Sequence, residues 1–130
     1  KRYGVNLRAT TAASDADKAR LLSDADVVFC AAKAGVQVLN ASVLSDAKKL
    51  KVAGDVNAVA PLGIEGVELM DNGEPLKFTP QCPKAVGIGA LAVGNVKYKL
   101  QQALLRETLE SDKPVYLDFR NAFEGARKLV

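Results

Sequence analysis

The chain has 130 residues, 48% of them apolar and 25% charged, a balance typical of one globular domain. Its net charge of +3 is small and dispersed, which argues against a nucleic-acid partner, and no apolar run approaches the roughly 20 residues of a membrane span. There is no histidine, and Cys30 and Cys82 lack metal-ligand spacing, so no metal site is expected. These properties favour a cytoplasmic protein that binds an anionic small molecule.

The first part of the chain predicts a strand followed by a helix. Residues 5–10 alternate apolar and polar side chains, as a half-exposed edge strand does. Ser14 or Asp15 can cap a helix that runs through Leu22.

A repeated strand and helix pattern follows. Residues 26–32 form a continuous apolar run, typical of a parallel strand buried on both faces. Gly35 closes the next loop, residues 36–44 predict a helix, and residues 50–56 predict another strand. Because such alternating units build parallel sheets with right-handed crossovers, the fold class is α/β.

The second half of the chain predicts a small insertion, a last strand and two helices. Residues 67–70 and 76–78 flank an Asn-Gly pair, which favours a tight hairpin turn. Residues 84–88 predict the last strand and residues 90–110 a long helix, and Asp118 caps a final helix. We therefore expect a partial doubly wound, Rossmann-like parallel sheet with closing C-terminal helices.

The segment 53–66 carries the most informative pattern. An apolar strand runs into a polar turn and then into a loop that Pro61 stiffens and two glycines break. Small molecules bind beyond the carboxyl ends of strands in open α/β sheets, so this segment predicts a ligand loop. Asp55 and Asn57 either bond local backbone to shape the turn or orient the loop towards a ligand, and the pattern leaves both uses open.

Two polar side chains of the long helix share a face. Lys97 and Gln101 are four residues apart, which places them on the rim of the predicted cleft, although Lys97 also fits a solvated helix lysine. Beside them runs an apolar stripe expected to face the core: Val93, Val96, Leu100, Ala103 and Leu104.

The chain does not supply a glycine-rich phosphate loop. Gly87 and Gly89 have the first spacing of such a loop, but alanine stands at its third position and no acidic residue follows on a second strand. With the usual strand order 3-2-1-4-5-6, two strands would be absent between residues 5–10 and 26–32. We expect a missing N-terminal segment or a second chain to complete the sheet.

The loop Asp55-Val56-Asn57-Ala58-Val59-Ala60-Pro61-Leu62-Gly63-Ile64-Glu65-Gly66 and the helix start Gly87-Ile88-Gly89-Ala90-Leu91-Ala92-Val93-Gly94-Asn95-Val96-Lys97 together resemble the NADP-dependent methylene-tetrahydromethanopterin dehydrogenases. The resemblance runs from about residue 5 to the end and is closest over residues 55–101. It implies that residues 1–130 are the C-terminal part of a Rossmann-like NADP-binding domain, without the glycine-rich βαβ unit and the upstream catalytic domain. It further implies hydride transfer from a methylene-pterin, or methylene-tetrahydrofolate, to NADP in a homo-oligomer.

The resemblance also implies a set of site residues. Lys97 matches the family's pterin site directly, whereas Gln101 replaces a histidine of the family pattern, which puts the pterin preference in question. Lys33 replaces a small residue and is either a rim charge or an extra phosphate contact. No catalytic side chain is expected, because the nitrogens of the substrate stabilise the cation that hydride loss leaves. The implied cofactor contacts are Ala31, Ala32, Gly35, Asp55, Asn57, Pro61, Leu62 and Gly63.

Two other functions fit the same fold pattern. One is a shikimate-dehydrogenase-like reductase module, and the other is a non-catalytic Rossmann-like interaction module. For the dehydrogenase we expect parallel, adjacent strands near Val27, Val52 and Val86, with Lys97 pointing into a cleft at their carboxyl ends.

Overall fold

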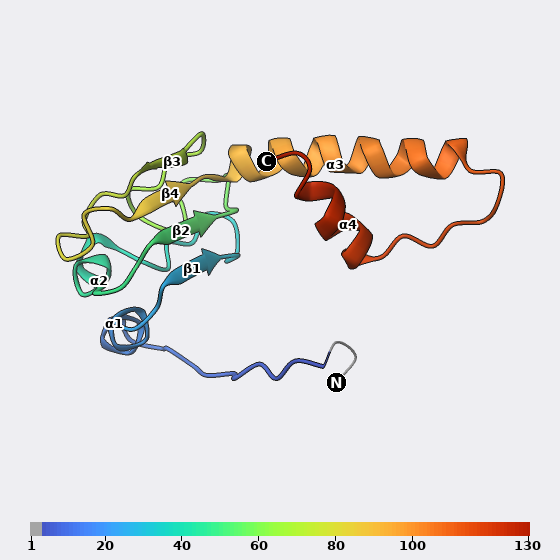
Figure 1. The fold of residues 1–130 in the computed structure, drawn as a ribbon. Helices are drawn as coiled ribbons and strands as arrows, with labels where there is room; N and C mark the ends of the chain where they lie inside the picture. The colour runs from blue at the N-terminus through green and yellow to red at the C-terminus, as the bar shows by residue number, and fades with distance from the viewer. Residues whose placement is uncertain (1–3) are drawn as a thin grey trace.

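A computed structural model describes residues 4–130 of the protein. Its centre is a four-stranded sheet in the order β1-β2-β4-β3 (Figure 1). β1 (Val27–Cys30), β2 (Val52–Asp55) and β4 (Val86–Ile88) are parallel neighbours, while β3 (Asn72–Pro75) runs antiparallel beside β4. The predicted α/β class and the parallel core of three strands are confirmed.

Two short helices pack against each other beside the sheet. α1 (Asp15–Leu22) begins at the predicted cap, where the Ser14 hydroxyl accepts a hydrogen bond from the Asp17 N–H and the Asp17 carboxylate accepts one from the Ser14 N–H. α2 (Ala41–Ser45) begins at Asn40, whose side chain accepts a hydrogen bond from the Val43 N–H.

The helix predicted over residues 36–44 is therefore shorter and later than expected. Residues 36–39 lie outside the helix because the Gly63 carbonyl accepts hydrogen bonds from the N–H groups of Val38 and Leu39, at 2.8 and 3.0 Å. Two β-branched valines in this segment also favour an extended backbone. The distant loop thus holds this segment through two of its N–H groups and keeps it out of the helix.

The hydrophobic core lies between one face of the sheet and these two helices. Leu44 of α2, Ala53 of β2 and Ile64 of the following loop are completely buried. The buried apolar residues of this core are Leu22, Cys30, Leu39, Val43, Leu44, Ala47, Leu50, Ala53, Ile64, Val67, Leu76, Cys82 and Ala85.

No segment among residues 4–130 covers the opposite face of β1, so this part of the chain does not bury the strand on both faces as expected. Val27 and Phe29 are 62% and 61% exposed, whereas Cys30 on the other face is buried. Phe29 lies across Gly54 of β2, where an added Cβ would come within 3.0 Å of the ring. A continuous apolar run predicts the chemistry of both faces but cannot show that both are covered.

Residues 5–10 do not form the predicted edge strand. They pair with no strand among residues 4–130, and Leu7 is 91% exposed. Figure 1 shows residues 4–13 as an isolated extended segment that leads into α1. An alternating pattern becomes a strand only beside another strand, because its hydrogen bonds lie between strands.

The predicted hairpin around the Asn-Gly pair is also wrong. Asn72 and Gly73 lie inside β3, and the pairing with β4 shifts register between Asn72 and Glu74. Gly73 has a φ of +98° at this bulge. The pair's tolerance of positive φ is used to bend an edge strand rather than to close a turn.

Two helices end the chain, as predicted. α3 spans Ala90–Glu110, and α4 spans Phe119–Ala126 behind the Asp118 cap, which accepts a hydrogen bond from the Arg120 N–H. α3 projects beyond the sheet, and α4 folds back against α3 (Figure 1).

The apolar stripe of α3 does not face the main core. No α3 residue is buried, although Leu100 packs on α4, where a Cβ at Gly125 would come within 2.7 Å of the Leu100 Cδ1 atom. No helix among residues 4–130 combines the length and the apolar character that crossing a bilayer requires.

Candidate functional site

The loop that follows β2 is held at both ends by one carboxylate. Asp55 is 1% exposed, and its Oδ1 and Oδ2 atoms accept hydrogen bonds from the N–H groups of Asn57 and Ile64, each at 2.9 Å. Hydrogen bonds to a buried charge are among the stronger ones in proteins. The buried Asp55 carboxylate therefore holds the two ends of the loop together.

Asn57 fills the inside of the same loop. Its Oδ1 atom accepts a hydrogen bond from the Val59 N–H at 3.0 Å, and its Nδ2 atom donates to the Pro61 carbonyl at 3.1 Å. Pro61 follows a cis peptide bond. Of the two uses that the sequence leaves open for Asp55 and Asn57, the structure shows the turn-shaping one.

Gly63 occupies the point where the loop returns to the strands. A Cβ at this position would lie 2.5 Å from the Cys30 Sγ atom and 3.0 Å from the Asp55 Oδ1 atom. Only glycine allows so close an approach between the loop and the carboxyl ends of β1 and β2.

A second loop lies beside the first. Residues 31–36 follow β1, and the Val36 N–H donates to the Lys33 carbonyl at 3.1 Å. Gly35 has a φ of +74°, and its ideal Cβ position is 3.6 Å from the Ala60 carbonyl oxygen. We refer to residues 31–36 and 57–63 as the strand-end loops.

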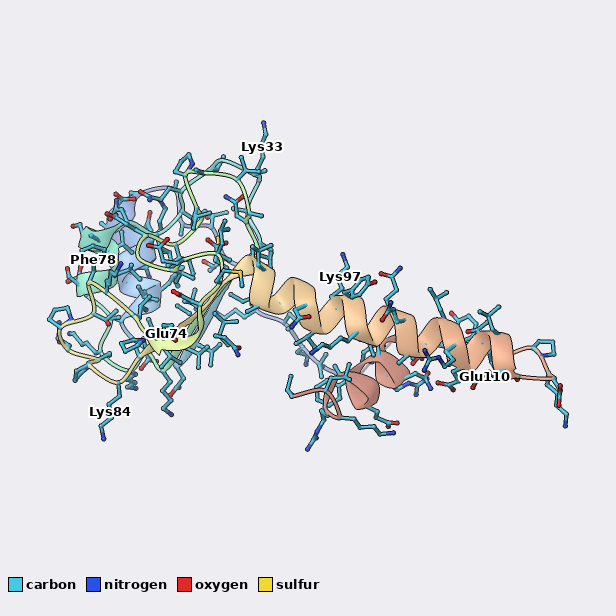
Figure 2. All side chains as sticks on the ribbon, turned by 90° about the horizontal axis from the view of Figure 1, so that it is seen from above. Lys33, Glu74, Phe78, Lys84, Lys97 and Glu110 are labelled. Carbon is cyan, nitrogen blue, oxygen red and sulfur yellow. The ribbon has the colours of Figure 1, made fainter. Side chains whose placement is uncertain are left out.

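The strand-end loops present a nearly uncharged surface. Lys33 is their single charged residue, and Figure 2 shows its side chain extending away from the domain. Val59, Ala60 and Pro61 are exposed, whereas Ala32 packs against the core. Such a surface offers backbone groups and small apolar side chains to a ligand.

Lys97 and Gln101 lie together elsewhere, along α3. Figure 2 shows Lys97 on the part of the helix that projects from the sheet domain. Both residues line an open groove, completed by Leu100, Leu104, Leu105, Thr108 and Leu117. This groove contains no residue of the strand-end loops, and their meeting in one cleft stays a prediction.

Gly87 and Gly89, the two glycines before α3, allow close packing rather than phosphate binding. This agrees with the sequence, in which alanine replaces the third glycine of a phosphate loop. A Cβ at Gly89 would lie 2.0 Å from the Glu68 carbonyl oxygen. The N–H groups of Gly89 and Leu91 donate to the carbonyls of Asp71 and Leu69, at 2.8 and 2.9 Å. These amides are therefore not free to bind a phosphate.

Two further titratable groups lie in β1 or directly before it, Cys30 and Asp26. Burial raises the pKa of the Cys30 thiol, and the nearby Asp55 carboxylate adds to the rise, which makes this cysteine a poor nucleophile. Asp26 pairs with Lys51 at 2.8 Å on the surface. Among residues 4–130, no group of three or more cysteine, aspartate or glutamate side chains could hold a metal ion.

One structural contact of the site region has no signal in the sequence. The Glu65 carboxylate accepts a hydrogen bond from the Ala41 N–H at 2.7 Å and so fixes the start of α2 beside the loop. The two residues are 24 positions apart, a separation at which no local motif applies.

No protein-family model matches the chain. The chain is 44% identical, over 129 residues and 99% of its length, to the NAD(P)-dependent methylenetetrahydromethanopterin dehydrogenase of Methylorubrum extorquens, of which it covers 42%. It is 31% identical, over its whole length, to the bifunctional protein MdtA of the same organism, of which it covers 43%. The chain thus spans less than half the length of these curated relatives. The resemblance seen in the loop and the helix is confirmed, and it extends along the whole chain.

Proposed function

We propose that the chain is the C-terminal part of the NADP-binding domain of a methylenetetrahydromethanopterin, or methylenetetrahydrofolate, dehydrogenase. The 44% identity over 99% of the chain carries this proposal. The three parallel strands with ligand loops at their carboxyl ends support it, because dinucleotides bind at that end of such sheets.

The strand-end loops fit the nicotinamide and ribose end of the cofactor. Ala31, Ala32, Gly35, Pro61 and Leu62 would contact it, because small side chains and backbone groups let a flat ring approach closely. The loop itself is held in place by Gly63, Asp55 and Asn57. The pyrophosphate requires free amides at a helix start, and two amides at the start of α3, those of Gly89 and Leu91, donate to the carbonyls of residues 71 and 69 instead.

The proposed reaction demands little acid or base chemistry from the chain. NADP, when bound, accepts a hydride from the methylene carbon between two nitrogens, and those nitrogens stabilise the cation left behind. The protein's part is to position the two reactants, which suits loops built from fixed backbone and apolar side chains. The shortage of titratable groups in the strand-end loops agrees with this role.

The groove on α3 is the proposed substrate contact. Leu100, Leu104 and Leu105 give it an apolar floor suited to a ring system, and Lys97 gives it a positive charge. Gln101 can hydrogen-bond a substrate but, unlike histidine, does not titrate. We further propose that the cofactor is NADP rather than NAD and that the complete protein is a homo-oligomer. A further segment or a second chain would complete the sheet. The two free cysteines agree with a reducing compartment such as the cytoplasm.

A chimera tests the proposal. These 130 residues replace the matched 129 residues of the M. extorquens dehydrogenase, and NADPH formation is followed with methylene-tetrahydromethanopterin, methylene-tetrahydrofolate and shikimate. We expect turnover with one of the two methylene substrates. A folded chimera that oxidises only shikimate would support the reductase alternative, and a folded chimera inert towards all three would support the interaction module.

A further inference from the structure

The Asn-Gly pair of β3 has no role in the site described above. Asn72-Gly73 is the single Asn-Gly pair in the chain, and the structure places it inside β3 rather than at a turn. All four residues of β3 are exposed, and this strand is an edge of the sheet. An asparagine before a glycine is chemically labile, because glycine has no side chain to keep its backbone nitrogen away from the asparagine amide. The pair is therefore a candidate modification site.

The side chain of Asn72 is free to rotate. Asn72 is exposed, and its amide makes no hydrogen bond within residues 4–130. By contrast, the side chains of Asn40, Asn57 and Asn121 each bond to a backbone group. Asn72 can therefore turn towards the next peptide nitrogen without losing a hydrogen bond.

The backbone at Gly73 also lies outside the regular part of the sheet. Asn72 pairs with Ile88 and Glu74 pairs with Gly87, so the register passes over Gly73 at the bulge. Gly73 has a φ of +98°, and no residue beyond its chain neighbours lies within 4 Å of its ideal Cβ position. The bulge therefore gives the Gly73 nitrogen room to approach the Asn72 Cγ atom.

We propose that Asn72 is a site of spontaneous deamidation in the folded protein. The Gly73 nitrogen loses its proton to solvent base and bonds to the Asn72 Cγ atom, while the side-chain amide takes up a proton and leaves as ammonia. The product is a succinimide ring. Water opens this ring at either carbonyl and leaves an aspartate or an isoaspartate at position 72. Water is consumed and ammonia released, so the step requires no oxidant or reductant, and it does not depend on the proposed function.

The modification would change the segment to which α3 is attached. The carbonyl of Asp71, directly before the site, accepts a hydrogen bond from the Gly89 N–H at 2.8 Å. An isoaspartate carries the main chain through its side-chain carbon, which adds an atom between this carbonyl and the rest of β3. Asn72 also lines a hollow of about 620 Å³ together with Lys99 of α3, so either product adds a negative charge there. An aged molecule would thus differ from a new one where α3 joins the sheet.

Peptide mass spectrometry of the 130-residue chain, stored at mildly alkaline pH and digested in acid, tests the proposal. The peptide that contains Asn72 should gain mass as its amide becomes an acid, and an isoaspartate methyltransferase should label the same peptide. Asn6 and Asn95 are exposed but precede the larger residues Leu7 and Val96, so their peptides are controls. The Asn72 peptide should react about tenfold faster, which corresponds to about 1.4 kcal/mol in the activation barrier. Equal rates would overturn the proposal.

Storage of the same chain in urea separates the effect of the fold from that of the sequence. Urea unfolds the chain, so the rate at Asn72 there is the rate of the unstructured segment. The native rate should lie within about a factor of ten of it, because the amide is exposed and unbonded and the bulge leaves room. A native chain that stays unmodified while the unfolded chain reacts would show that β3 protects the pair, and the proposal would be wrong.

Hydrogen exchange measures the effect on α3. The Gly89 amide should be protected in the new protein by its bond to Asp71, and it should exchange about tenfold faster in the aged protein. Asn72→Gln is the matched control: it keeps an exposed amide, but its longer side chain must close a larger and slower ring. Its Gly89 amide should stay protected after the same storage. Equal loss of protection in the variant would overturn the link between this site and α3.

Discussion

Asp55 and Ile64 are nine positions apart, yet the Ile64 N–H donates a hydrogen bond of 2.9 Å to the buried Asp55 carboxylate. This bond brings together the two ends of the loop that follows β2. The conformation of the exposed residues between them therefore depends on a buried side chain.

Asp55→Ala should lower the free energy of unfolding by about 3 kcal/mol, because it leaves two buried N–H groups without their charged acceptor. Urea unfolding measures the change. Asp24→Ala, which removes an exposed ion pair with Lys49, is the control and should cost less than about 1 kcal/mol. Equal effects of the two substitutions would contradict the role assigned to Asp55.

Gly63→Ala should destabilise the chain by about 2 kcal/mol, because the new Cβ meets the Cys30 sulfur at 2.5 Å. In the Cys30→Ala background the same change should cost clearly less, since the sulfur is gone. The rescue should be partial, because the Asp55 oxygens remain within 3.2 Å. A double-mutant cycle in urea measures the coupling, and additive effects would disprove the close contact.

The 130-residue chain alone should not bind NADP with useful affinity. Pyrophosphate binding depends on free amides at a helix start, and those of Gly89 and Leu91 donate to backbone carbonyls instead. Calorimetric titration with NADP checks this, with the chimera as the positive control. Micromolar binding by the isolated chain would place the pyrophosphate site within these residues.

Lys97→Ala in the chimera should raise the KM for the methylene-pterin about fivefold, the effect of losing one partly solvated charge contact, and leave the KM for NADP unchanged. Lys99→Ala is a matched control, because Lys99 lies on the same helix but lines a different hollow, with Met70 and Asn72. If both substitutions act equally, general charge rather than the groove explains the effect.

Local signals predicted much of the fold. The starts of α1 and α4 follow from the Ser14 and Asp118 side chains, which bond backbone within three residues. The long helix has no side-chain cap, and its apolar periodicity predicts it instead. The parallel strands follow from apolar runs separated by helix patterns. These caps and strands depend on residues that are close in the sequence, so local patterns are enough to predict them.

The errors concern partners that are distant in the sequence. The Gly63 carbonyl binds the N–H groups of Val38 and Leu39 and so keeps these residues outside α2. Residues 5–10 are not a strand because they pair with no strand among residues 4–130. The same limit applies to the site. The sequence indicates that Asp55 and Asn57 shape or orient a loop, but the choice depends on which backbone groups their oxygens meet. The distance between Lys97 and that loop depends on tertiary contacts that no local pattern describes.

The attachment of α3 to the sheet has a mechanical consequence. Hydrogen bonds from Gly89 and Leu91 to residues 71 and 69 fix the first turn, so the direction of the whole helix is set within that short segment. Lys97 lies eight residues beyond Gly89, a distance of about 12 Å along the axis, so a tilt of about 10° at the base swings it by about 2 Å. A side-chain change in residues 68–71 would thus alter the reach of Lys97 without touching it, as a hinge governs the tip of a lever.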